Sequence, residues 1–288
     1  MQKGFLNIAI VLVVAVVFGI GGYVLVSKNS PQTEKPMVST NLDQNNTAQK
    51  ESETKKTEQK KEITYHDPSY ESNKKVSCPD PFIFELPIDI NKATSILYPG
   101  QVRGNDYKAH GGFRFDHSRT EEITVVAPID ASVVTGARYP VDGEVQYTLE
   151  FEHPCGIRYR LGHLLTLTPK FQAIAEKFPL PAGLDSRTTE VRPPITVKKG
   201  EIIATAIGLT GDGAGGTGQV NTFLDWGVYD YRQKNKASED PLWAASHNSD
   251  TYQYAVCWFD WISAENRAKV LALPPADGVH GKESDYCK

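Results

Sequence analysis

The residues from Phe5 to Val26 form an uncharged run of mostly Val, Ile, Leu, Ala and Gly. A bilayer offers no water to satisfy backbone polar groups, so such a run must be helical there, and about 20 residues span the hydrocarbon core. A buried core helix and a cleaved signal peptide are the alternatives. The run is longer than a usual signal core, and no clear small-residue cleavage site follows it. The sequence therefore predicts an uncleaved transmembrane anchor at residues 5–26.

The segments around this anchor set the expected organisation of the chain. Lys3 precedes the run and Lys28 follows it, and the short tail 1–4 favours a cytoplasmic N-terminus with the bulk of the chain on the extracytoplasmic side. Residues 27–77 are rich in Lys, Glu, Gln, Thr, Ser and Asn, which cannot bury enough apolar surface to offset their ordering entropy. We expect a disordered polar linker at 27–77 and a globular domain at 78–288.

Charge and cysteine usage narrow the partners and the compartment. The chain has 31 Lys+Arg against 35 Asp+Glu and no dominant basic run, which argues against a nucleic-acid partner. All four cysteines fall in the expected domain, as in proteins with disulfides in an oxidising compartment. Zinc-bound or free buried thiols are the alternatives, although no two cysteines have the close spacing of zinc sites. Of the three connectivities, we favour Cys257–Cys287 with Cys78–Cys155.

Strand-like pieces dominate residues 78–288. Alternating or short apolar runs bounded by turn residues occur at 123–137, 145–153, 157–164, 200–208 and 223–231. This spacing predicts an all-β fold, a mainly antiparallel β-sandwich or an open barrel, with short helices at Phe171–Phe178 and after a Ser263 N-cap. An irregular insert at about 166–194 is expected to form a lid or binding loop. A C-terminal extension at about 235–288 is expected to pack through Trp258 and Trp261.

Five segments in order carry a resemblance to a known family: HGGFR (His110–Arg114), VVAPIDASV (Val125–Val133), YRLGHL (Tyr159–Leu164), VKKGEIIATAIGLTG (Val197–Gly211) and FLDWGV (Phe223–Val228). Together they resemble the lysostaphin/LytM-like zinc metallopeptidases, which cleave peptide cross-bridges of bacterial peptidoglycan. The resemblance covers just under half of the chain. It implies a small antiparallel β-sandwich with a duplicated hybrid motif.

The residues at the implied zinc site depart from the family pattern. His110 matches the first zinc ligand, but Arg114 stands where the family has an Asp, and Asp225 stands where it has the last ligand His. His163 matches one catalytic His, with one extra residue after Tyr159, and is expected to be a catalytic remnant. The other catalytic His is replaced by Phe223.

Two interpretations of this altered site follow. On a strand, residues two apart share a face, so Arg114 and Asp225 would both point to the place of the metal and could form a bidentate ion pair there. No cofactor is then expected. Alternatively, Asp116 replaces the missing ligand, and His110, Asp116 and Asp225 hold zinc with His117 or His163 nearby.

The sequence therefore predicts a membrane-anchored cell-envelope protein with a degenerate, non-catalytic lysostaphin-like domain. It would bind peptidoglycan or regulate a cell-wall hydrolase, in a groove floored near His110 and His163 and roofed by the insert. The resemblance to inactive regulators of hydrolases is an analogy at the level of the fold. The alternatives are an active zinc metalloendopeptidase with a non-standard ligand set and a purely structural envelope protein.

Overall fold

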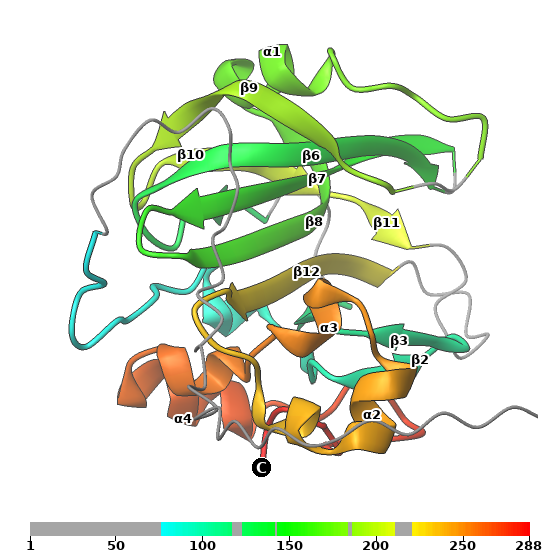
Figure 1. Ribbon diagram of the computed structural model, residues 1–288. Helices are drawn as coiled ribbons and strands as arrows, with labels where there is room; N and C mark the ends of the chain where they lie inside the picture. Colours follow the sequence, from blue (N-terminus) through cyan, green and yellow to red (C-terminus); the bar gives the residue numbers. More distant parts are fainter. Residues whose placement is uncertain (1–75, 117–122, 142, 184–185, 211–220) are drawn as a thin grey trace, which may run out of the picture. The chain divides into compact units, whose positions relative to one another are not determined.

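The computed structural model describes residues 76–116, 123–141, 143–183, 186–210 and 221–288 (Figure 1). The predicted anchor at 5–26 and nearly all of the predicted linker at 27–77 lie outside these residues. Within the described ranges, no helix is long and apolar enough to cross a membrane.

The described chain is mainly antiparallel β-sheet. The strands are β1 (Ser95–Leu97), β2 (Gln101–Arg103), β3 (Asp106–Lys108), β4 (Gly111–Arg114), β5 (Val125–Val126), β6 (Ala131–Val141), β7 (Glu144–His153), β8 (Ile157–Leu167), β9 (Thr189–Val197), β10 (Ile202–Ile207), β11 (Leu209–Thr210) and β12 (Asn221–Asp230). The main sheet has the order β1-β4-β12-β8-β7-β6-β9. Strand β10 pairs with β5 and β8, and β2 pairs with β3 as a separate hairpin. The all-β prediction is confirmed at this level.

Alternation along the central strands separates a core face from an outer face. Leu149 of β7, Tyr159 and Leu161 of β8, and Trp226 of β12 are fully buried on the core face. The residues between them, such as Glu150 and Arg160, point to the opposite face because successive strand residues alternate. The outer face is polar. We therefore expect any side chains that bind a ligand or catalyse a reaction to lie on this face.

Short helices surround the sheet. They are α1 (Pro169–Ala175), α2 (Pro241–Ser246), α3 (Asp250–Gln253) and α4 (Ala264–Ala272), with 3-10 turns at Ile90–Lys92, Lys236–Glu239 and Trp258–Trp261. In Figure 1, α1 lies beside β9 at one end of the sheet and α2, α3 and α4 lie at the other. The predicted Ser263 cap is confirmed, since the Ser263 hydroxyl accepts a hydrogen bond from the Asn266 amide at 3.2 Å.

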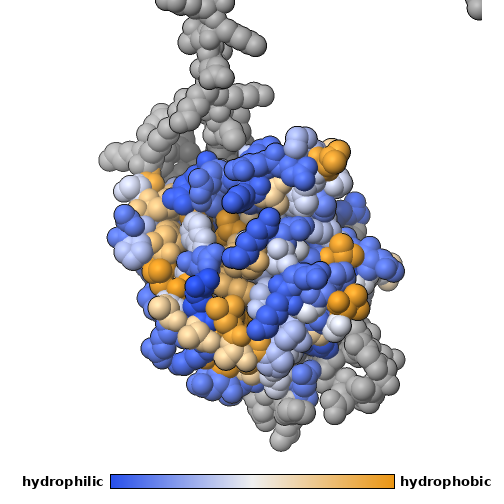
Figure 2. Space-filling view, turned by 90° about the horizontal axis from the view of Figure 1, so that it is seen from below, coloured by the Kyte–Doolittle hydropathy of each residue, from blue (hydrophilic) through white to orange (hydrophobic). Residues whose placement is uncertain are grey.

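The C-terminal extension closes one edge of the sheet. The Ile96 amide of β1 donates to the Pro274 carbonyl at 3.0 Å, and the Ala276 amide donates to the Ile96 carbonyl at 2.8 Å. Trp258 is fully buried, as predicted, and Trp261 packs against the core. Seen from below, the surface of this end mixes hydrophilic side chains with apolar patches (Figure 2). Leu242 and Val279 are the most exposed large apolar side chains of the described chain, at 83% and 84%.

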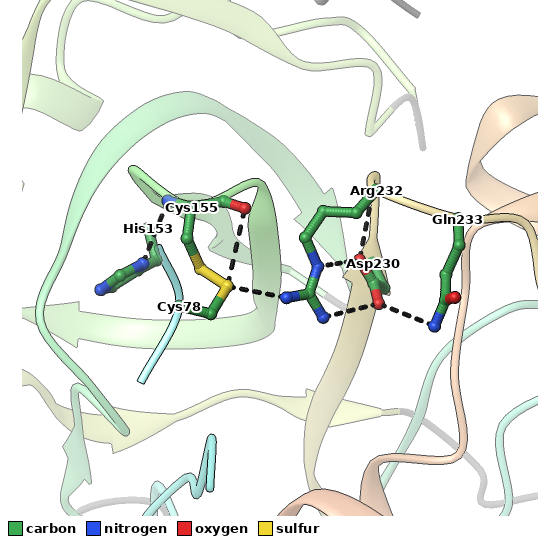
Figure 3. The surroundings of a disulfide bond; sticks show 6 residues. All are labelled: Cys78, His153, Cys155, Asp230, Arg232 and Gln233. Carbon is green, nitrogen blue, oxygen red and sulfur yellow. Dashed lines mark hydrogen bonds and ion pairs between the residues drawn. A yellow bond between two sulfur atoms is a disulfide. The ribbon is translucent and has the colours of Figure 1, made fainter. Parts of the chain in front are cut away.

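Both predicted disulfides are present. Cys257–Cys287 holds the C-terminal tail, and Cys78–Cys155 joins the start of the domain to the turn between β7 and β8. Figure 3 shows the second bond: Arg232 Nη1 lies 2.9 Å from Cys78 Sγ, and Arg232 Nε donates to Asp230 Oδ1 at 2.7 Å. The described domain contains no free cysteine. Two disulfides fit an oxidising compartment.

Candidate functional site

Strands β4 and β12 bring together the residues that the sequence singled out. In their register Gly112 lies opposite Asp225, and Arg114 lies opposite Phe223. His110 directly precedes β4, on the same face as Gly112. Gly112 must lack a side chain here, because a Cβ would lie 2.2 Å from the Leu224 carbonyl oxygen of β12. The close approach of the two strands places the His110 imidazole against the Asp225 carboxylate.

A β-bulge in β8 turns His163 toward the same carboxylate. Tyr147 of β7 pairs with Leu164, and Leu149 pairs with Leu161, so two residues of β8, Gly162 and His163, share the space opposite Thr148. His163 adopts φ 59°, which is unusual for a residue with a side chain. With regular alternation His163 would share the core face with Leu161. The extra residue after Tyr159 is therefore absorbed by the bulge.

The site centres on Asp225, which is only 4% exposed. His110 Nε2 lies 3.2 Å from Asp225 Oδ2, and His163 Nε2 lies 3.6 Å from the same oxygen. His163 Nδ1 lies 2.7 Å from Gln146 Oε1, while Gln146 Nε2 donates to Glu144 Oε2. Because an amide oxygen only accepts, this network assigns a proton to His163 Nδ1. A neutral His163 then presents an unprotonated Nε2 to the site.

The electrostatics favour one buried anion between two neutral imidazoles. Burial lowers the pKa of His110 to about 4, although the Asp225 charge acts in the opposite direction. Burial likewise lowers the pKa of His163. Burial alone would raise the pKa of Asp225, but the two histidines and Arg160 outweigh it and hold that pKa well below its usual range. At neutral pH the guanidinium groups of Arg160 and Arg103 supply positive charge to Asp225.

The lowered pKa of His110 predicts a pH dependence of stability. Between about 4 and the ordinary 6.5 the unfolded chain carries a proton on this residue and the folded chain does not. The free energy of unfolding should therefore rise with pH across this window, by at most about 1.4 kcal/mol per pH unit from His110. Urea unfolding of the natural chain and of His110→Gln at several pH values isolates the contribution. The prediction is contradicted if the stability of the two proteins depends on pH in the same way, or if NMR gives His110 a pKa of 6.5 or above.

Arg160, Gln146 and Tyr229 belong to the site but were not among the predicted residues. Arg160 pairs with Gly227 across β8 and β12, beside Asp225. The signal for Gln146 was present, because Gln146, Thr148, Glu150 and Glu152 alternate as polar residues along one face of β7. For Arg160 and Tyr229 the sequence could not show which strands would be neighbours.

The predicted Arg114–Asp225 ion pair is wrong. Arg114 Nε lies 3.9 Å from Asp116 Oδ1, and Asp225 contacts the two histidines instead. The register explains this, because the neighbour of Arg114 on β12 is Phe223, whose ring packs on His163 with centroids 4.9 Å apart.

Asp116 is also not at the site. Its Oδ2 accepts from the Thr94 hydroxyl at 2.7 Å. It follows Gly112, the partner of Asp225, by four residues, which is about 13 Å along an extended chain. The ligand set of His110, Asp116 and Asp225 is therefore not assembled, and His117 lies outside the described residues. Among the residues placed by the structure, no group of three or more His, Cys, Asp and Glu side chains could hold a metal ion.

The helical part of the insert does not cover the site. Phe171 of α1 and Phe178 after it are buried in the core, and Phe171 packs on Phe151 with ring centroids 6.4 Å apart. Phe151 stacks on Tyr159, on the face of β8 opposite Arg160. This part of the expected roof therefore lies on the core face of the sheet, opposite the site. The outer face instead carries Tyr229, which packs with Ala109 and Ala255, with Tyr252 and Tyr286 beside them.

Comparison of the chain with known protein families, with curated proteins and with solved structures finds no match.

Proposed function

We propose that this chain is a membrane-anchored, envelope-facing protein whose domain is a degenerate lysostaphin-like peptidase domain that binds peptidoglycan, or a cell-wall hydrolase, without cleaving it. The observation that carries this proposal is the 3.2 Å contact between His110 Nε2 and Asp225 Oδ2. At the positions of two zinc ligands in the resembled family, this chain has an imidazole and a carboxylate that contact each other. The anchor at residues 5–26 would hold the domain at the outer side of the membrane.

The surroundings of that pair support a binding role. Arg114 replaces a carboxylate ligand, and the Arg160 guanidinium acts on Asp225 and on both histidines. A fixed positive charge opposes a second cation at the same place. The polar outer face would then serve as a recognition surface and would hydrolyse nothing.

A specific observation favours the alternative, an active zinc metalloendopeptidase. The Nε2 atoms of His110 and His163 lie 3.2 and 3.6 Å from Asp225 Oδ2. Ligand atoms of a tetrahedral zinc with bonds of roughly 2.0–2.1 Å are about 3.3 Å apart. His163 would then act as a ligand in place of Asp116, and the three side chains would have to rearrange, because they form no metal-holding group among the described residues. Arg160 weighs against this alternative, because its charge would face the zinc ion.

Zinc content separates the two functions. The purified full-length chain should carry no stoichiometric zinc, whereas Arg114→Asp/Asp225→His, which restores the family ligands, should bind it. Stoichiometric zinc in the natural chain that is lost in His163→Ala would support the peptidase instead.

Binding to purified sacculi then tests the positive part of the proposal. The full-length chain should sediment with sacculi and release no peptide from them, and Asp225→Ala should sediment less. If the natural chain and the variant sediment equally, the surface that binds sacculi does not include Asp225. No binding to sacculi or to an envelope hydrolase would leave the domain as a structural scaffold.

A further inference from the structure

Arg160 is a half-buried guanidinium without a hydrogen-bond partner among the described residues. Its Nε is inaccessible to solvent and makes no hydrogen bond. Arg158, two residues earlier on the same face of β8, contrasts with it, because Arg158 Nη2 donates to Glu152 Oε2 at 2.7 Å. A guanidinium has five N–H donors, and leaving buried donors unpaired costs about 1–3 kcal/mol or more. The sheet therefore holds a cation with at least one buried donor, Nε, that has no hydrogen-bond partner.

Two further unpaired atoms lie beside it. Asp225 Oδ1 and Tyr229 Oη are buried without a hydrogen-bond partner, and their residues are 4% and 2% exposed. Asp225 and Tyr229 flank Gly227, which is the register partner of Arg160. Tyr229 Oη lies 2.6 Å from the position that a Cβ of Gly227 would occupy, and His110 Cβ lies 3.0 Å from it. The Tyr229 hydroxyl and His110 thus lie directly over Gly227, with Asp225 two residues before it on the same face of β12 and Arg160 opposite it on β8.

This set of groups selects a ligand with both an acceptor and a donor. Arg160 and the Tyr229 hydroxyl can donate to a carboxylate, which a guanidinium binds in a bidentate manner. Asp225 Oδ1 can only accept, so it requires an N–H or O–H beside that carboxylate. A simple anion would leave Asp225 Oδ1 without a donor and would be repelled by its charge. A simple ammonium ion would be repelled by the Arg160 guanidinium. A peptide C-terminus has the required pair, a carboxylate and an amide N–H on the same residue.

We propose that the outer face of β8 and β12 binds the C-terminal carboxylate of a peptide, with Arg160 and Tyr229 donating to the carboxylate and Asp225 accepting from the last amide N–H. This assignment rests on the proposed binding function and names the chemical class of its ligand. His110 and His163 retain partial side-chain exposure, at 13% and 17%, so solvent reaches part of the cluster. Both are neutral near pH 7 and add no competing charge.

A matched pair of probes tests the assignment. N-acetyl-diglycine and its C-terminal amide differ only in the carboxylate, and ligand-observed NMR with the full-length chain compares them. We expect the acid to bind at least about tenfold more tightly than the amide. Arg160→Gln should lose that preference, and Arg160→Lys should recover only part of it because an ammonium lacks the planar fork. Arg158→Gln, on the same face, should keep the preference.

Several results would overturn the assignment. Equal binding of acid and amide, or an unchanged preference in Arg160→Gln, would remove the carboxylate contact. Acetate binding as tightly as N-acetyl-diglycine would reduce the site to one for an adventitious ion only. If the chain binds sacculi but binds the acid and amide probes equally, the proposed ligand class is wrong and the proposed binding function stands. If neither sacculi nor probes bind, both proposals fail. Amide spectra of each variant confirm that it is folded.

Discussion

Replacing Gly112 with alanine should destabilise the domain by about 4 kcal/mol or more, the largest effect expected of any single substitution considered for this chain. The added Cβ would lie 2.2 Å from the Leu224 carbonyl oxygen and 3.2 Å from Asp225 Cα. Both neighbours are backbone atoms of β12, so no side-chain rotation can relieve the overlap. Strands β4 and β12 would have to separate, which breaks the ladder in the middle of the sheet.

Denaturant unfolding followed by circular dichroism, with both disulfides intact, measures this loss. Gly278→Ala is the matched control, because a Cβ at Gly278 meets no atom within 4 Å and should change stability by no more than about 0.5 kcal/mol. The same contact sets the distance between His110 and Asp225, so any folded Gly112→Ala protein should also lose the acid preference of the site. A stability within about 1 kcal/mol of the control would mean that β4 and β12 are not packed as described.

Much of the fold could be predicted because it depends on local pattern. Alternation along 145–153 and 223–231 gave strands β7 and β12, and the same rule placed Gly112 and Arg114 on one face. Both cysteine pairings were also anticipated. These predictions need only the period of two along a strand and the covalent chemistry of the side chains.

The candidate site was predicted less well because it depends on register between strands. A shift of two residues decides whether Asp225 faces Arg114 or Gly112, and nothing in either strand alone fixes that choice. His163 required a bulge to reach Asp225, and one extra residue in the sequence does not say which way a bulge turns. The insert was misplaced because its buried anchors, Phe171 and Phe178, were not recognised as core residues.

Removing the carboxylate of Asp225 should cost about 3–5 kcal/mol of stability, because it takes from the half-buried Arg160 charge its largest electrostatic partner and leaves only Glu150 as a nearby carboxylate among the described residues. Asp225 is the first electrostatic partner of Arg160 and the hydrogen-bond acceptor of His110. Asp225→Ala should therefore be far more costly than Asp116→Ala, which removes the hydrogen bond to the Thr94 hydroxyl and the 3.9 Å contact with Arg114 at a more exposed position, and should cost about 1 kcal/mol. Asp225→Asn keeps the shape of the side chain and separates the loss of charge from the cavity.

A double-mutant cycle with Arg160→Met decides whether the two charges act as a pair. If they do, Arg160→Met should recover part of the stability lost in Asp225→Ala, and the double variant should be more stable than the sum of the single effects by about 1–3 kcal/mol. Replacing both members of a buried charge pair is often nearly neutral, whereas removing one is costly. Additive single effects would mean that Arg160 is solvated independently of Asp225. The guanidinium would then not be held in place for a ligand carboxylate, and recognition at this face would have to rest on His110 and His163 alone.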